Sequence, residues 1–274
     1  ALIPPVLLRA GFGLYGRLAP RQAALTAASL LTRPRGRNPP QPWEHEPTDP
    51  LPEPRVLPGD LHALQWGDSG PLVLGLHGWR GRPTQFGRLA EAMVAAGYRM
   101  IVLDAPGHGR SRGLAATPRL LGEALVEAGA ALGEVHALIG HSLGGAAAPI
   151  AIELGLRVRR LVMIGSPARP SRLIEWYADQ LGLPLQARRR LDEWFDAHAG
   201  RPAALLDPVA LAPHVEASVM VVHDEDDEII PAADARLLEA AWPQAQMLYT
   251  RGLGHRNVLS DPEVVAAVRA FIAG

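Results

Sequence analysis

The sequence Gly140-His141-Ser142-Leu143-Gly144 is the most informative segment of this chain. It fits the pattern Gly-x-Ser-x-Gly, follows an apolar segment at 137–139 and precedes small residues at 145–148. A strand that turns sharply into a helix needs glycine beside the serine, because side chains there have no room. We therefore predict that the turn holds the hydroxyl of Ser142 above the carboxyl end of a strand, with the amino end of a helix behind it.

Around this motif, apolar segments alternate with helical patterns from residue 61 to the end of the chain. The expected strands are 61–66, 72–76, 100–103, 137–139, 161–164, 219–222 and 246–249. The expected helices are 84–96, 120–132, 142–154, 232–241 and 262–272. Fully apolar strands that alternate with helices indicate a parallel sheet covered on both faces. We therefore predict an α/β fold with a doubly wound, mostly parallel central sheet.

One interval interrupts the alternation and predicts a small helical cap insertion at about 165–216. It contains no clear strand but carries Trp176, Tyr177, Trp194 and Phe195. These four aromatic residues are candidate walls of an apolar substrate pocket. The alternative is that they only attach the insertion to the rest of the domain.

The N-terminal region differs in composition from the predicted domain at 55–274. Residues 1–33 are helical in pattern, with Leu7, Ala10, Leu14 and Leu18 at helical spacing and a second helix at about 21–31. Residues 34–54 contain eight prolines and predict an extended strap. The helices either pack on the main body or lie on a membrane surface, and the small number of basic residues weakens the second interpretation.

The composition excludes several classes of protein and site. The chain has 274 residues, 48% of them hydrophobic, and a formal net charge of -1, so we expect a globular protein and no nucleic-acid partner. It has no cysteine, which excludes disulfides and thiolate metal sites. The acidic run at 224–228 lacks the spaced oxygen ligands of a calcium loop. We expect no metal, no cofactor, and a cytoplasmic or membrane-peripheral location; the oligomeric state stays open.

A serine hydroxyl needs a general base to become an effective nucleophile. His255 is the candidate base, because it follows the last expected strand and precedes the last expected helix. A third, acidic residue should orient the imidazole, and the loop after strand 219–222 carries five acids at 224–228. From these residues alone the choice among the five stays open, and most of them are expected to be solvated.

From about residue 61 onward the chain resembles the α/β-hydrolase superfamily. The matching segments, in the family's order, are His77-Gly78-Trp79, Asp104–Ser111, the Ser142 motif, Asp227–Pro231 and Gly254-His255. The resemblance implies a catalytic triad of Ser142, Asp227 and His255, because the family's acid lies four residues before the proline that opens the next helix. It also implies an oxyanion hole formed by the backbone N–H groups of Trp79 and Leu143.

The resemblance further implies an enzyme that cleaves a small-molecule carboxylic ester through an acyl-enzyme, with a preference for short to medium acyl chains. A thioesterase or acyltransferase on the same triad is the first alternative, and a non-catalytic ligand-binding homologue is the second. Serine at 142 argues against dehalogenase and epoxide-hydrolase chemistry, which uses aspartate there. We expect His77 and His108 to be structural, Asp104 to fix its own loop, and His141 to pack against the following helix.

Overall fold

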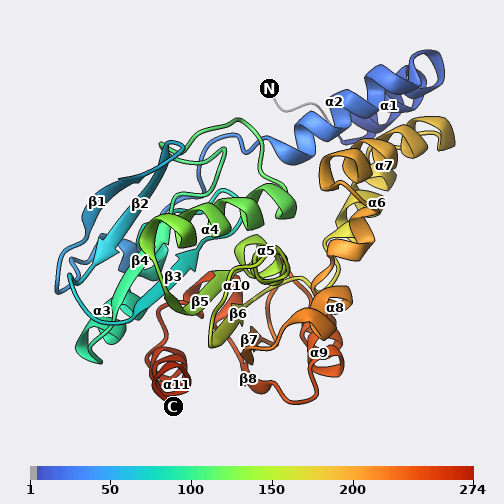
Figure 1. Cartoon of the computed structure of the whole chain (residues 1–274). Helices are drawn as coiled ribbons and strands as arrows, with labels where there is room; N and C mark the ends of the chain where they lie inside the picture. The colour runs from blue at the N-terminus through green and yellow to red at the C-terminus, as the bar shows by residue number, and fades with distance from the viewer. Residues whose placement is uncertain (1–4) are drawn as a thin grey trace.

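The computed structural model describes residues 5–274 (Figure 1). The first four residues of the predicted helical segment 1–33 lie outside the described part. An eight-stranded sheet forms the centre, in the order β1-β2-β4-β3-β5-β6-β7-β8. The strands are β1 (Glu53–Leu57), β2 (Leu61–Trp66), β3 (Leu72–Leu76), β4 (Arg99–Leu103), β5 (Val135–His141), β6 (Arg160–Ile164), β7 (Ser218–Asp224) and β8 (Gln246–Thr250).

The six strands β4-β3-β5-β6-β7-β8 are parallel to one another. At one edge, β2 pairs antiparallel with β4, and β1 pairs antiparallel with β2. The prediction of a doubly wound, mostly parallel sheet is confirmed. Only β1 was not predicted, because Pro54 interrupts the pattern and the residues of β1 are largely exposed. Proline is tolerated in this strand because β1 lies at the edge, where one side of the backbone has no partner strand.

Helices cover both faces of the sheet. On one face Leu89 and Met93 of α3 (Gly87–Ala95) share an apolar core with Val264 and Val268 of α11 (Pro262–Ala273). The other face carries α4 (Pro118–Leu132), α5 (Leu143–Glu153), α8 (Pro208–Leu211) and α9 (Ala232–Ala241). The connections between parallel strands change direction between β3 and β5. The carboxyl ends of β3 and β5 therefore border the crevice where ligands bind in open α/β sheets.

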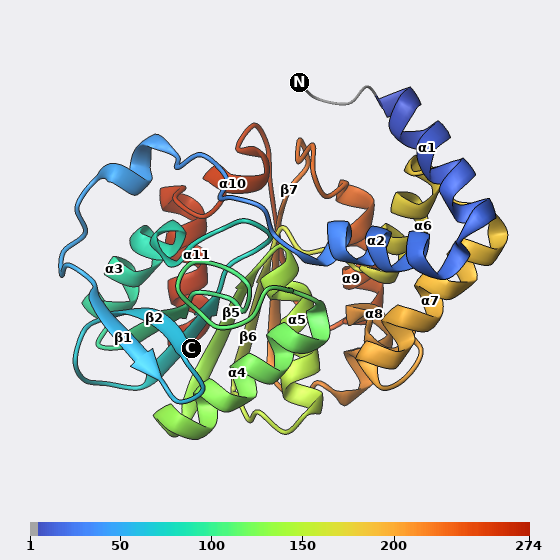
Figure 2. The same ribbon diagram turned by 90° about the horizontal axis from the view of Figure 1, so that it is seen from above.

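The cap insertion forms α6 (Ser171–Gln180) and α7 (Leu185–Ala199), which the N-terminal helices α1 (Pro5–Leu18) and α2 (Pro20–Thr32) cover (Figure 2). Ala23 and Ala27 of α2 share a core with Leu191 of α7. The N-terminal helices therefore pack on the insertion rather than on the sheet. No helix within residues 5–274 combines the length and apolar character needed to cross a bilayer.

The apolar stripe of α1 is not its packing face. Leu7, Leu14 and Leu18 are 62%, 59% and 77% exposed, whereas Phe12 is buried on the opposite side. Gly16 allows the close packing, since a Cβ there would lie 2.5 Å from Cδ of Pro184. Glycine permits this approach, and the leucines are left facing away from the protein.

Candidate active site

Ser142 lies in the sharp turn between β5 and α5, as the motif predicts. Its backbone is strained, with φ 53° and ψ -120°, and its N–H donates to the carbonyl of Ile164 at 2.8 Å. Glycine is required on both sides of this turn. A Cβ on Gly140 would lie 2.4 Å from Cα of Gly145, and one on Gly144 would lie 2.2 Å from the carbonyl oxygen of Leu76.

His255 and Asp227 form a hydrogen-bonded pair. Nδ1 of His255 lies 2.7 Å from Oδ2 of Asp227, and Oδ1 of Asp227 accepts the N–H groups of Ile229 and Ile230 at 2.8 and 2.9 Å. Burial alone would raise the pKa of Asp227, but the hydrogen bond and positive charge of His255 and the two N–H donors lower it below its ordinary value. Asp227 is therefore suited to orient an imidazole and stabilise its protonated form.

Two other acids of the same run hold the loops in place. Oδ2 of Asp224 accepts the Thr250 hydroxyl at 2.8 Å and the Leu253 N–H at 3.1 Å. Asp226 accepts the N–H of Gly252 at 2.9 Å. Three of the five acids, Glu225, Asp226 and Glu228, are not buried, in agreement with the expectation for most of the run. Asp224 is buried because its carboxylate joins the acid loop to the histidine loop.

His141 also contacts the histidine loop. Its Nε2 lies 2.8 Å from the carbonyl oxygen of His255, so Nε2–H donates to that carbonyl. The expectation that His141 packs against the following helix is wrong, since its ring lies beside that of His255 with centroids 4.7 Å apart. Burial, followed by the charge of His255, lowers the pKa of His141 to about 3 and keeps the ring neutral.

Ser142 and His255 both lie beside the carboxyl end of β6. Ser142 is bonded to Ile164, and a Cβ on the next residue, Gly165, would lie 3.4 Å from Nδ1 of His255. Among the hydrogen bonds of residues 5–274, none joins Oγ of Ser142 to His255. Catalytic hydrogen bonds are often long in the free enzyme and shorten when substrate binds.

The loop after β3 approaches Ser142 closely. A Cβ on Gly78 would lie 2.7 Å from Cβ of Ser142, so the backbone leading into Trp79 passes directly beside the serine. Trp79, Leu143 and Ser142 line the same pocket. Within the described chain, the N–H groups of Trp79 and Leu143 donate to no other residue. Both N–H groups are thus available to an oxygen bound beside Ser142.

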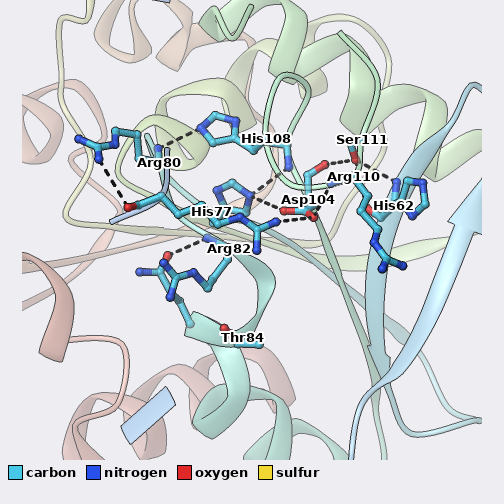
Figure 3. A network of polar contacts seen from close by, with 12 residues as sticks. His62, His77, Arg80, Arg82, Thr84, Asp104, His108, Arg110 and Ser111 are labelled. Atoms are coloured by element: carbon cyan, nitrogen blue, oxygen red, sulfur yellow. Dashed lines mark hydrogen bonds and ion pairs between the residues drawn. The ribbon is translucent and has the colours of Figure 1, made fainter. Parts of the chain in front are cut away.

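A network of buried histidines supports this loop (Figure 3). Nε2 of His77 accepts the N–H of Ala105 at 3.0 Å, and Nε2 of His108 accepts the N–H of Arg80 at 2.9 Å. Burial, followed by the charge of His77, lowers the pKa of His108 to about 4. Both rings therefore serve as structural acceptors, as predicted. Asp104 fixes its own loop, as predicted, by accepting the N–H of Arg110 at 3.2 Å.

The proline-rich strap also holds the loop after β3. Nδ2 of Asn38 donates to the carbonyl of Trp79 at 3.0 Å, and the N–H of Asn38 donates to the carbonyl of Arg80 at 2.9 Å. Arg37 pairs with Asp104 at 3.3 Å. Sequence patterns did not indicate these contacts, because Arg37 and Asn38 belong to no motif and lie 67 and 41 residues from Asp104 and Trp79.

A cavity of about 380 Å³ opens beside Ser142. Trp176, Tyr177 and Phe195 line it, in agreement with their prediction as pocket walls. Trp194 is not among the lining residues, because its ring stacks along α7 on His198, one turn further on, with centroids 3.7 Å apart. Residues that the sequence did not indicate complete the wall, including Leu30, Leu31 and Thr32 of α2 and Leu173 and Ile174 of α6.

Most polar groups in the cavity wall are already bonded within the protein. Asp207 accepts the N–H and the hydroxyl of Ser171 at 2.9 and 2.5 Å and so caps α6. Burial raises the pKa of Asp207. Thr32 donates to the carbonyl of Ala28 at 2.8 Å, and Thr117 accepts the N–H of Leu120 at 3.3 Å. The cavity therefore offers mainly apolar surface to a ligand.

A strained serine turn, a histidine–aspartate pair and a covered parallel sheet together define a hydrolase of the α/β class. A profile described as "Alpha/beta hydrolase family" matches residues 73–268. The chain belongs to this family.

One curated relative is similar over a limited region. A 2-hydroxy-6-oxononadienedioate/2-hydroxy-6-oxononatrienedioate hydrolase from Burkholderia vietnamiensis is 36% identical over 105 residues. That match covers 35% of this chain and 33% of the relative, so it spans about a third of each protein.

Solved structures share the fold at low sequence identity. The thioesterase domain from the curacin biosynthetic pathway is 18% identical, with a TM-score of 0.61, over 82% of this chain and all of that domain. A bacterial membrane phospholipase A is 16% identical, with a TM-score of 0.58, over 97% of this chain and 95% of its own. The second likeness spans nearly the whole chain.

Proposed function

We propose that the protein hydrolyses carboxylic esters through a covalent acyl-serine intermediate. The observation that carries the proposal is the placement of Ser142, in a strained turn, at the wall of an apolar cavity. The hydrogen-bonded pair of His255 and Asp227 lies on the neighbouring loops. A serine hydroxyl, a histidine base and a buried carboxylate are the groups that nucleophilic acyl transfer needs.

The reaction takes place in two steps. Oγ of Ser142 attacks the ester carbonyl while His255 takes the hydroxyl proton, and the N–H groups of Trp79 and Leu143 bind the oxyanion. The tetrahedral intermediate collapses, the proton passes from His255 to the leaving alkoxide, and an alcohol departs. Water then attacks the acyl-serine with His255 as base, which releases the carboxylic acid and restores Ser142.

The cavity favours an apolar acyl group of short to medium length. Its volume of about 380 Å³ lies near the lower end of the range for ligand pockets, roughly 300–1,000 Å³. Each buried methylene contributes about 0.8 kcal/mol until the pocket is full. We therefore place the optimum at acyl chains of about four to eight carbons.

A dicarboxylate substrate fits the wall less well. The Burkholderia relative is named for a dioate, which carries two carboxyl groups. Arg119 lines the cavity, but its Nε is bonded to Glu123 at 2.7 Å. The bonded Asp207 adds a carboxyl group to the same wall. An ester of an apolar monocarboxylic acid is the better match to this surface.

The proposal is tested by kcat/KM across p-nitrophenyl esters from acetate to palmitate, with matched acyl thioesters and a phospholipid. The phospholipid is included because one structural neighbour is described as a membrane phospholipase A. We expect oxygen esters to be cleaved with a maximum at medium chain length. A preference for thioesters would favour the thioesterase alternative. A kcat/KM that rises steadily up to sixteen carbons would contradict a pocket that fits only short to medium acyl chains.

A further inference from the structure

The outer face of α1 carries an apolar surface that no other part of the described chain covers. Leu7, Leu14 and Leu18 lie on one side of the helix and are all more than half exposed. Val6, on an adjacent side of the helix, is 76% exposed. We call these four residues the α1 face. Leucines at this spacing normally pack against a core, so their exposure indicates an external partner.

The charge of the surrounding sequence identifies the kind of partner. Residues 1–43 contain no aspartate or glutamate, although the whole chain has a formal net charge of -1. The same region contains Arg9, Arg17, Arg21, Arg33, Arg35 and Arg37. Arg17 and Arg21 are exposed at the end of α1 and the start of α2, and in the described chain neither pairs with a carboxylate. The apolar face is therefore bordered by uncompensated positive charge.

We propose that the α1 face docks on the surface of an anionic lipid bilayer. An amphipathic helix with leucines on one face and arginines at its border binds such a surface by burying the leucines and attracting the lipid phosphates. A second copy of this chain fits less well, because a symmetric contact through this face would bring together two segments that carry arginines and no acidic residue. This binding goes beyond the proposed esterase activity and does not require it.

The position of α2 gives the docking a structural consequence. Only Ala19 separates α1 from α2, and the far end of α2 supplies Leu30 and Leu31 to the cavity wall. The same helical pair thus forms both the docking surface and one side of the substrate cavity. A bilayer that holds α1 also holds this wall of the cavity.

The test is cosedimentation of the full chain with vesicles, which needs no catalysis. Vesicles of phosphatidylcholine mixed with phosphatidylglycerol should bind the protein more tightly than vesicles of phosphatidylcholine alone. The triple substitution Leu7→Ser, Leu14→Ser and Leu18→Ser should weaken partitioning at least tenfold, since each leucine loses its buried area. The substitutions Arg17→Gln and Arg21→Gln should weaken it by about fivefold each on the anionic vesicles only.

A matched control keeps the test specific to the α1 face. Leu51 and Val56 are 67% and 65% exposed at the β1 end of the molecule, away from α1 (Figure 1). Leu51→Ser with Val56→Ser should leave vesicle binding unchanged, and circular dichroism should show all variants folded. Unchanged binding of the triple leucine variant would overturn the proposal. Light scattering gives a second test. If the wild-type chain formed a dimer, bound no vesicles, and became monomeric on the triple leucine substitution, the α1 face would be a self-association surface and the proposal would be overturned.

Discussion

The side-chain amide of Asn38 donates to the carbonyl oxygen of Trp79 at 3.0 Å. Asn38 lies outside residues 73–268, where the family profile matches, whereas Trp79 carries one of the two N–H groups that we assign to the oxyanion hole. His108 also holds the loop, by accepting the N–H of Arg80. The strap is thus a second support for a loop whose position is critical, because oxyanion donors act only when they are correctly placed.

We expect Asn38→Ala to lower kcat about tenfold while KM changes little, because the lost hydrogen bond loosens a loop used mainly in the transition state. Asn38 acts as a positioning residue, so the split between kcat and KM is the informative measurement. Arg35→Ala, on the same strap, is the control, since Arg35 is exposed. Equal effects of the two substitutions, or a loss seen only as lower thermal stability, would contradict a positioning role.

Asp227→Asn should reduce turnover by about 10³–10⁴, because an amide no longer fixes the His255 tautomer or stabilises its charge. Asp224→Asn is the matched variant. It should lower the melting temperature, since Asp224 bonds Thr250 and Leu253, but it should reduce kcat far less. Turnover measured well below the melting temperature of each variant separates the two effects. If Asp224→Asn proved the more damaging substitution to kcat, the choice of Asp227 would be wrong.

Much of the fold was accessible from sequence because it depends on local patterns. The predicted strands 61–66 and 72–76 match β2 and β3 residue for residue, and the glycines around Ser142 predict the sharp turn. The missing parts depend on contacts between distant segments. Leu31 enters the cavity only because α2 packs on α7, and Asn38 reaches Trp79 only because the strap crosses the loop. The sequence could not show that the α1 leucines face away from the protein, because helical spacing is the same for leucines that pack on a core and for leucines that are exposed.

The free energy of unfolding should fall as the pH drops from about 6.5 toward 4. In this interval a histidine of the unfolded chain takes up a proton, whereas a buried neutral histidine of the folded chain does not. His108 has a pKa of about 4 in the folded chain, and His141 one of about 3. Because both pKa values are depressed, this stability is fully present above about pH 6.5. His108 alone should account for roughly 3 kcal/mol of the free energy of unfolding by pH 4.

Urea unfolding at a series of pH values checks this prediction. His108→Gln offers an uncharged side chain that can still accept from the N–H of Arg80, so its stability should depend less on pH across the same interval. His45→Gln is the control, because His45 lies in the strap outside the buried network. A wild-type stability that is flat between about pH 6.5 and 4 would rule out neutral, buried histidines.

Tyr177 and Trp194 provide a paired test of the cavity wall. Tyr177 lines the cavity, whereas Trp194 does not line it and instead stacks on His198, one of the lining residues. Tyr177→Ala should enlarge the cavity and move the optimum of kcat/KM toward longer acyl chains, with about 0.8 kcal/mol gained per additional buried methylene. Trp194→Ala should lower stability and leave the optimum in place. A shift of the optimum in Trp194→Ala alone would mean that the wall is assigned to the wrong aromatic residue.

Covalent labelling with a fluorophosphonate, followed by mass spectrometry, tests the nucleophilic role of Ser142 most directly. The wild-type chain should acquire one adduct, on the peptide that contains Ser142, and Ser142→Ala should acquire none while remaining folded. Ser171→Ala, which alters another serine of the same cavity, should still be labelled. His255→Gln should slow labelling by at least about 10³ because the base is lost. An absence of any adduct on the wild-type chain, or an adduct that persists in Ser142→Ala, would contradict a serine hydrolase acting through Ser142.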